Sequence, residues 1–481
     1  MVKYIPRSSI TIACALMLAG CAAVGPDFHR PASEGVVPGA FARDRLEASE
    51  APTLLTTTDV RDTVFWSGFG DEQLTQLVQQ ALQNNHDLGA AMARLQAAES
   101  MLNQTQWDRF PTVTMNGAAT QQKLSADQVS PGQPRSTRSY HSGIAAHWEL
   151  DLYGRVRRAI EAEQAQLQAS NADVAALQVV IAAQVADSYT QLQGLQARLH
   201  IAQEALANQD ATLHLVKRRV QAGSGTDLDS TRAEAQLQTT KARIPPLKLQ
   251  IAMQQHRLAV LLGVSPDRLI AQLDVPKALP HMPPAVAPGT PAELLRRRPD
   301  VAAAEARLHA ATARIGIATA DLFPKVSLGG LLGSFTLAGN DLFNGRSANS
   351  SVFLGVDWSF LDVGRVRARI TASEAGAAEA LAQYKQGVLL ALEETENALV
   401  QVHRNSEELA TWNAAAQQRD RAEQLAQRMY LGGTLSLYEV LDAQRDQLAA
   451  QDAKEQSQIN AVRASIALYK AMAGGWTVAS Q

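Results

Sequence analysis

Residues 155–223 read RVRRAIEAEQAQLQASNADVAALQVVIAAQVADSYTQLQGLQARLHIAQEALANQDATLHLVKRRVQAG, a run of 69 residues without proline and with one interior glycine, Gly194. As a continuous helix this run would be about 100 Å long, far more than a globular domain needs. Apolar residues recur along it at seven-residue steps, at Val185, Leu192, Leu199, Leu206, Leu213 and Val220. Sustained heptads are typical of coiled-coil packing, and a single helix in a large globular core is the alternative.

The composition of the whole chain agrees with long helices. The chain has 481 residues, 5% aromatic and 46% hydrophobic, with much of the apolar share supplied by alanine. Its 44 Lys and Arg against 47 Asp and Glu give a net charge of −3, so no positive surplus points to nucleic acid. The only two cysteines, Cys14 and Cys21, lie in the first 21 residues, which excludes a disulfide, a Cys metal site and a Cys nucleophile from the rest of the chain.

The N-terminus has the features of an export signal. Lys3 and Arg7 precede a short apolar run that is too short to span a bilayer as a mature helix. The run ends in Leu18-Ala19-Gly20-Cys21, which resembles the bacterial lipobox. The resemblance implies that residues 1–20 are a lipoprotein signal peptide and that Cys21 carries an S-diacylglycerol and an N-acyl group. Ala22 favours the outer membrane over the inner one, and a plain secretory signal with a chance cysteine is the alternative.

The chain also contains two copies of one unit. Residues 87–98 (DLGAAMARLQAA) match residues 300–311 (DVAAAEARLHAA) at an offset of 213, and Gly154–Arg157 match Gly364–Arg367 at an offset of 210. One register kept over so long a stretch indicates an internal duplication. We therefore divide the chain into a signal peptide (1–20), an N-terminal lipid-anchored linker (21–70), repeat 1 (71–274), a linker (275–290), repeat 2 (291–473) and a C-terminal tail (474–481).

Each repeat has the same predicted order of helix, two strands, long helix, tip and helix. The strands are predicted from the alternation of apolar with small or polar residues. In repeat 1 we expect helices over 71–108, 155–223 and 229–262, with a bend at Pro245-Pro246, and strands over 112–120 and 140–149. In repeat 2 we expect helices over 291–321, 365–433 and 439–473 and strands over 326–332 and 352–360. The lengths match if two short helices stack end to end alongside each long one.

Several motifs together resemble one family, the TolC-like outer-membrane factors of tripartite efflux pumps, and within it the lipid-anchored drug-efflux branch. They are Cys21 with Gly25-Pro26-Asp27-Phe28 and Arg30-Pro31, Phe65-Trp66-x-x-Phe69-x-Asp71, Arg298-Pro299-Asp300-Val301, Leu322-Phe323-Pro324 and Leu441-Asp442-Ala443-Gln444. The resemblance implies a homotrimer with a twelve-stranded β-barrel in outer-membrane lipid, continued by an α-helical barrel across the periplasm. It also implies a passive exit duct for drugs or other small molecules, fed by a periplasmic adaptor (a membrane fusion protein) and an inner-membrane transporter of the RND type.

Strand number supports this architecture independently. Four strands per chain cannot close a membrane barrel, because the smallest bacterial barrels have eight strands and an open strand edge in lipid is prohibitive. Three copies would supply twelve. The Val, Leu and Trp face would then meet lipid, and a small polar face would line the lumen, with Thr112, Thr114, Asn116, Ser327 and Gly355.

A duct needs a gate rather than a catalytic centre, and the helix tips at 223–229 and 432–439 are the place to expect one. By resemblance, Tyr438 falls at the apolar constriction, Asp442 in an acidic ring and Arg445 at the position that braces it, with Glu439 adding further carboxylates. A plain surface pair is the alternative for Asp442 and Arg445. Leu435 stands where some relatives hold a gate-locking basic residue. An adaptor would dock at the tips through Gly223, Thr226, Asp229, Gly433 and Ser436, unless these residues serve only the turns.

No enzyme signature is present in the sequence. His141 and His147 share a strand face but have no third ligand nearby, so we expect them to line a polar lumen rather than bind metal. We expect no cofactor beyond the lipid on Cys21. Two other readings remain, a protein-secretion duct of the same fold and a structural, lipid-anchored periplasmic coiled coil.

Overall fold

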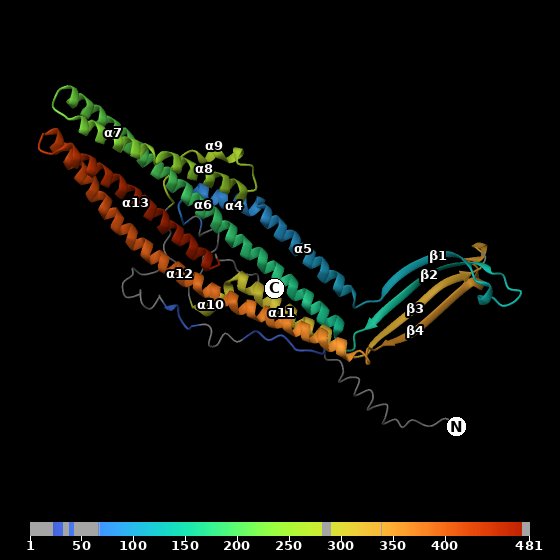
Figure 1. The fold of residues 1–481 in the computed structure, drawn as a ribbon. Coiled ribbons are helices and arrows are strands. Elements are labelled where there is room, and N and C mark those ends of the chain that lie inside the picture. Colours follow the sequence, from blue (N-terminus) through green and yellow to red (C-terminus); the bar gives the residue numbers. More distant parts are fainter. Residues whose placement is uncertain are drawn as a thin grey trace. The chain divides into compact units, whose positions relative to one another are not determined.

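The computed structural model describes residues 23–31, 38–42, 66, 68–280, 290–337 and 339–473 (Figure 1). Cys14, Cys21 and most of the predicted N-terminal linker lie outside these residues. The chain divides into two compact units, of which unit 1 comprises Met1–Pro31, Arg94–Asn171 and Ala303–Lys385. Unit 2 comprises Ala32–Ala93, Ala172–Ala302 and Gln386–Gln481. Each unit takes segments from both repeats.

The predicted order of elements is confirmed in both repeats. Repeat 1 contains α4 (Glu72–Asn84), α5 (His86–Trp107), β1 (Thr112–Lys123), β2 (Ser136–Leu150), α6 (Arg155–Gln221), α7 (Asp227–Lys241) and α8 (Ile244–Leu261), followed by the short α9 (Asp267–Leu273). Repeat 2 contains α10 (Pro291–Arg297), α11 (Pro299–Ala320), β3 (Lys325–Thr336), β4 (Ala348–Asp357), α12 (Val363–Leu431) and α13 (Leu437–Ala471). The two long helices, α6 and α12, lie within two residues of their predicted bounds.

Three helices that we predicted as continuous are divided. The break between α7 and α8 confirms the bend expected at Pro245-Pro246, because proline lacks the N–H that a helix interior requires. The break at Arg298 precedes Pro299, and Arg298 is accordingly extended, with φ −69° and ψ 117°. The break at Asn85 has a side-chain cause, since Asn85 Oδ1 accepts the Leu88 N–H at 3.1 Å and so caps the start of α5.

The breaks at Asn85 and Arg298 share one hydrogen bond, repeated at equivalent positions. Asn85 Nδ2 donates to the Leu261 carbonyl at 2.9 Å, and Arg298 Nη1 donates to the Ala471 carbonyl at 2.8 Å. The two donors are 213 residues apart and the two acceptors 210, which are the offsets of the sequence repeat. Each buried side chain thus satisfies a carbonyl in the last turn of a helix, α8 or α13, that has no partner within that helix. The recurrence supports the predicted duplication.

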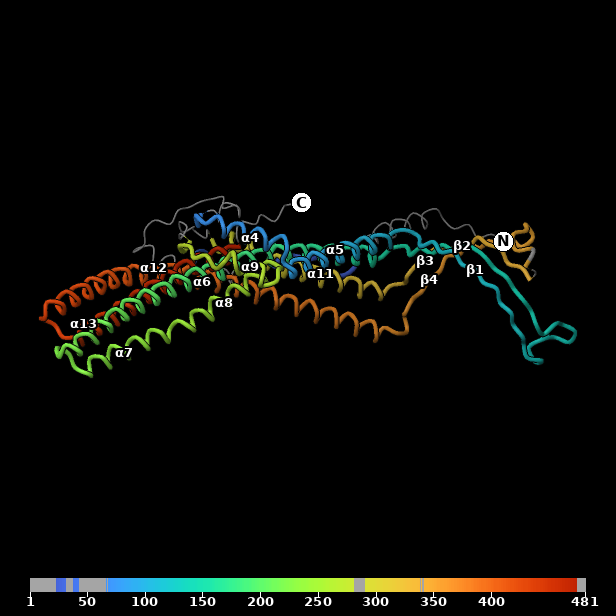
Figure 2. Tube along the Cα trace, turned by 90° about the horizontal axis from the view of Figure 1, so that it is seen from above, coloured from blue at the N-terminus to red at the C-terminus, as the bar shows by residue number. Residues whose placement is uncertain are grey.

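The four strands of unit 1 form one antiparallel sheet in the order β1-β2-β3-β4, and Figures 1 and 2 show them as a curved ribbon. The β2–β3 pairing joins the two repeats, with Ile144 opposite Leu332. This register places the predicted apolar residues of all four strands on a single face: Val113, Met115, Ile144, Ala146, Trp148, Leu328, Leu332, Val352, Leu354 and Val356. The predicted small polar residues Thr112, Thr114, Asn116, Ser327 and Gly355 share the opposite face.

The apolar face of the sheet has no partner within the chain. Met115 is 79% exposed and Val352 82% exposed. At the base of the sheet, the indole N–H groups of Trp148 and Trp358 donate to the carbonyls of Arg109 and Leu322, each at 3.0 Å. These two bonds also occupy equivalent repeat positions. They anchor the ends of β2 and β4 to the segments that enter β1 and β3.

The N-terminal segment 23–31 is tightly held against the helices of unit 1. Gly25, with φ +91°, approaches Gly316 so closely that a Cβ on Gly25 would lie 2.4 Å from the Gly316 Cα. Arg158, almost fully buried, donates to the Val24 and Gly25 carbonyls and to Asp27 at 2.6 Å. Burial opposes the charged form of Arg158, but the hydrogen bonds to Asp27 and Glu161 outweigh it and raise its pKa.

The core of unit 2 contains two fully buried tyrosines. Tyr469 packs edge-on against Trp66, with ring centroids 4.7 Å apart. Tyr189 donates its hydroxyl to Asp71 Oδ2 at 2.8 Å, while Asp71 Oδ1 caps α4 by accepting the Leu74 N–H. Burial and the Asp71 carboxylate both raise the pKa of Tyr189, so its hydroxyl stays protonated and the cap stays bound.

We predict that the two breaks differ in their contribution to stability. Arg298→Ala should lower the free energy of unfolding by about 3–5 kcal/mol, because Glu394 then keeps a buried charge with Lys470 as its remaining partner. Asn85→Ala should cost about 1–3 kcal/mol, the loss of a buried neutral hydrogen-bond partner. Urea unfolding of the detergent-solubilised protein, followed by circular dichroism, measures both. The exposed neighbour Arg297→Ala is the charge-matched control, and an equal loss in Arg297→Ala and Arg298→Ala would contradict the account.

Candidate functional site: the helix tips

Both long helices reverse through the same backbone motif at their tips. In repeat 1 the Ser224 N–H donates to the Arg219 carbonyl and the Gly223 N–H to the Val220 carbonyl. In repeat 2 the Thr434 and Gly433 N–H groups make the same two bonds, to Met429 and Tyr430. This is a Schellman motif, which needs a left-handed residue, and Gly223 and Gly433 have φ of +77° and +73°. Their φ values are reason enough for glycine at both positions.

The helices that leave the tips begin with capping boxes. The Thr226 hydroxyl accepts the Asp229 N–H, and Asp229 Oδ2 accepts the Thr226 N–H at 3.1 Å. Ser436 and Glu439 form the same arrangement at the start of α13, and the hydrogen bonds from Ser436 lower the pKa of Glu439. Both carboxylates are therefore engaged in capping. This role differs from the ring of free carboxylates that we expected from Glu439.

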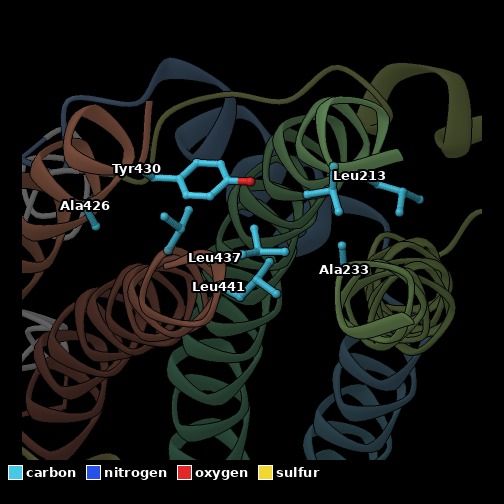
Figure 3. Close-up of a cluster of buried hydrophobic side chains, with 8 residues drawn as sticks. Leu213, Ala233, Ala426, Tyr430, Leu437 and Leu441 are labelled. Atoms are coloured by element: carbon cyan, nitrogen blue, oxygen red, sulfur yellow. The ribbon is translucent and has the colours of Figure 1, made fainter. Parts of the chain in front are cut away.

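A shared apolar cluster lies just behind the two tips (Figure 3). It joins the α6–α7 tip to the α12–α13 tip through Leu213, Val216, Ala233, Ala426, Tyr430, Leu437, Val440 and Leu441. In Figure 3 the Tyr430 ring points from α12 toward Leu437 and the other members of the cluster. Because the cluster is common to both tips, any outward displacement of one tip from the other would expose these side chains to water.

Two arginines of repeat 1 lie over tyrosines of repeat 2. The Arg219 guanidinium lies 4.4 Å from the centroid of the Tyr430 ring, and the Arg232 guanidinium lies 5.7 Å from that of Tyr438. Both distances are within the range of a cation–π interaction. The Tyr438 ring is 58% exposed, so it is available at the tip surface as the predicted constriction requires.

The structure brings Asp442 and Arg445 together as an ion pair on the surface of α13. Arg445 also contacts Asp446 at 3.3 Å, and Asp446 in turn pairs with Arg419 of α12 at 2.8 Å. The Asp446 hydrogen bond and the charge of Asp442 raise the pKa of Arg445. The i,i+3 pair that we gave as the alternative is thus present, within a chain of four charged side chains.

Sequence reasoning missed Arg232, Arg419 and Asp446. A signal for the Arg419–Asp446 pair does exist, because the two residues are equally distant along the chain from the tip, as partners in an antiparallel helix pair must be. The same rule finds Lys217 and Glu234, whose ion pair closes the other tip at 3.4 Å. Arg232 has no such signal, since its ring partner belongs to the other repeat. At the repeat offset of 210, Arg232 takes the place of Asp442.

The remaining predicted site residues have simpler outcomes. Cys21 lies outside the described residues. His141 and His147 fall on the small polar face of the sheet, opposite Ala118 and Thr112 in the β1–β2 pairing. Among the residues that the structure describes, no group of three or more His, Cys, Asp or Glu is placed to hold a metal ion.

Comparison with known proteins gives the context of these tips. The family model described as "Outer membrane efflux protein" matches residues 77–264 and 290–474. The pyoverdine export outer membrane protein OpmQ of Pseudomonas putida is 32% identical over 477 residues, which cover 98% of each chain. The probable outer membrane lipoprotein SilC of Salmonella typhimurium is 26% identical over 97% of this chain and 98% of its own.

A solved structure, that of the outer-membrane channel OprN, superposes with a TM-score of 0.86 at 39% identity, and covers 94% of this chain and 99% of its own. These names describe export and channel proteins rather than enzymes. The resemblance and the fold class inferred from the sequence are confirmed. The chain therefore belongs to the outer membrane efflux protein family and is a component of the outer membrane that extends into the periplasm.

Proposed function

We propose that this protein is the exit duct of a tripartite efflux pump, in which three copies share one barrel. The observation that carries the proposal is the sheet of unit 1. Among the described strands, β1 pairs only with β2, and β4 only with β3, so both edges of the sheet are open. Its apolar face is also exposed along all four strands. Both deficits are removed if the sheet joins others in lipid and closes into a barrel.

Three copies would contribute twelve strands, an even number within the range of bacterial outer-membrane barrels. The apolar face would contact lipid and the small polar face would line the lumen. The long helices would continue the barrel on the periplasmic side, with the tips of α6–α7 and α12–α13 at its far end. A periplasmic adaptor would dock there, around Gly223, Thr226, Asp229, Gly433 and Ser436, and connect the duct to an inner-membrane transporter of the RND type.

The cargo is proposed to be small molecules. The name of OpmQ describes export of pyoverdine, a small molecule, which favours this class of cargo over secreted proteins. A structural coiled coil anchored by lipid alone would leave the four amphipathic strands without a role. The duct itself would be passive, because the tips contain capping boxes, Schellman turns and surface ion pairs but no arrangement for catalysis.

The tips are proposed as the gate. Three-fold symmetry would turn Asp442 into a ring of three carboxylates and Tyr438 into a ring of three phenol side chains. Arg445 would brace the acidic ring through its contact with Asp442. Arg232 would hold Tyr438 in place from repeat 1, since its guanidinium lies over that ring. The apolar cluster behind the tips would favour the closed arrangement, because opening would expose its side chains.

The lipid anchor on Cys21 is supported by the path of the segment that follows it. The Val24 N–H donates to the Tyr153 carbonyl at 3.0 Å, and Ala23 lies against Gly154, between the end of β2 and the start of α6. Two residues of chain reach at most about 7 Å, so the acyl chains on Cys21 would enter the membrane close to the end of the β2 strand. The name of the relative SilC, a probable outer membrane lipoprotein, agrees with such an anchor.

We predict that Asp442→Ala and Tyr438→Ala each raise the single-channel conductance in a planar lipid bilayer several-fold. The first removes the acidic ring and its brace, and the second widens the constriction. Asp210→Ala is the matched control, because Asp210 forms only a local, exposed pair with His214 and its loss should leave conductance unchanged. Unchanged conductance in both tip variants would refute the gate, while the absence of any channel in the wild-type protein would refute the duct.

The anchor has its own test. Cells labelled with radioactive palmitate should incorporate the label into the wild-type protein and into Cys14→Ala, since Cys14 is removed with the signal peptide. Cys21→Ala should carry no label, because the acylated sulfur is absent. Equal labelling of Cys21→Ala and wild type would show that the anchor lies elsewhere.

A further inference from the structure

A basic hollow lies within unit 2, away from the tips. It has a volume of about 400 Å³ and is enclosed by α6, α8 and α13. Its lining includes three cationic side chains, Arg257, Arg463 and Lys470, and one acidic side chain, Asp187. A volume of this size is within the range of small-molecule sites.

The hollow faces away from the helices that cover unit 2. On α6, Tyr189 points toward Asp71 at the start of α4, whereas Asp187 is two residues, or about 200°, around the helix. On α8, Gln255 donates to Asp274 at the end of α9, and Arg257 is again two residues further. In the proposed duct the lumen must be free of covering helices if cargo is to pass. The face with α4 and α9 is therefore the outside, and the hollow opens to the lumen.

The charges of the hollow are not fully compensated. Asp187 accepts from Arg463 Nε at 2.5 Å and from Gln191 at 2.7 Å. Lys470 pairs at 2.7 Å with Glu394, which lies outside the lining and whose other oxygen accepts from Arg298 at 2.8 Å. Burial opposes the charge of Glu394, but the hydrogen bonds from Lys470 and Arg298 outweigh it and lower its pKa, so this partner stays ionised.

Arg257 is the exception. Its Nη2 donates to the neutral side chain of Gln184 at 2.9 Å, and no carboxylate pairs with it among the described residues. The Arg463 side chain remains 42% exposed while it holds Asp187, so it keeps donors for a ligand. Two guanidinium groups thus line one hollow, one of them without a counter-charge. Planar guanidinium donors match the geometry of carboxylate and phosphate oxygens.

We propose that this hollow binds the anionic group, a carboxylate or a phosphate, of small molecules that pass through the duct. Arg257 supplies the uncompensated charge and Arg463 supplies further N–H donors. With three copies around one axis, the lumen would contain three such sites. The position of the hollow on the lumen rests on the proposed function, whereas its affinity for anions does not.

Calorimetric titration of the full-length, detergent-solubilised protein tests the binding. Citrate and inorganic phosphate, titrated separately at low ionic strength, are the probes, and the tighter binder identifies the anionic group. We expect saturable binding that 0.5 M NaCl abolishes. Arg257→Gln should weaken it by roughly tenfold or more, the loss of a charge-assisted hydrogen bond. Arg257→Lys should restore part of it.

Lys248→Gln is the matched control, because Lys248 is an exposed cation on the same helix, nine residues away and half a turn from Arg257. Its affinity should equal that of the wild type. The proposal is overturned if neither probe binds the wild type, or if Arg257→Gln and Lys248→Gln bind equally well.

Planar-bilayer reversal potentials under a KCl gradient separate this proposal from the duct. If the duct conducts, Arg257→Gln should shift its selectivity toward cations, and an unshifted potential would place the hollow outside the lumen. Citrate or phosphate binding in a protein that forms no channel would support the anion site and refute the duct. A conducting wild-type channel that binds neither anion would do the reverse.

Discussion

The backbone edge of a β-strand in lipid is the constraint on which this molecule depends. An edge strand presents a row of N–H and C=O groups that water cannot reach in the hydrocarbon core, so it must be paired. This chain supplies four strands with β1 and β4 open at the two sides, and an apolar face with no partner in the described structure. The sheet is complete only in an assembly, and the periplasmic helices, the tips and the proposed lumen take their meaning from that assembly.

The two repeats use the same contacts where the scaffold is built and different ones where function is proposed. Asn85 and Arg298 hold the last turns of α8 and α13, Trp148 and Trp358 anchor the strands, and both tips combine a Schellman turn with a capping box. At the tips the repeats diverge, since Arg232 stands where repeat 2 has Asp442. Three copies of such a chain would have nearly six-fold walls but a three-fold tip, which lets one repeat form a constriction and the other brace it.

Sequence periodicity was sufficient for the long helices and the sheet faces, because both depend on local patterns. The heptads predicted α6 to within two residues, and period-2 alternation placed Val113, Ile144 and Leu354 on one face, as the strand register confirms. The break at Asn85 could not be predicted, since its partner Leu261 is 176 residues away. The role of Glu439 was also misjudged, because its position three residues after Ser436 indicates a capping box as well as a ring. Cys21 and the gate stay predictions.

The most direct test of this account is the native mass of the detergent-extracted protein, with the contributions of detergent and lipid subtracted. The account predicts a single species of three chains, because only shared strands close the barrel. A monodisperse monomer that keeps its strands and its fold in detergent would contradict it, since four strands would then be stable with both edges open.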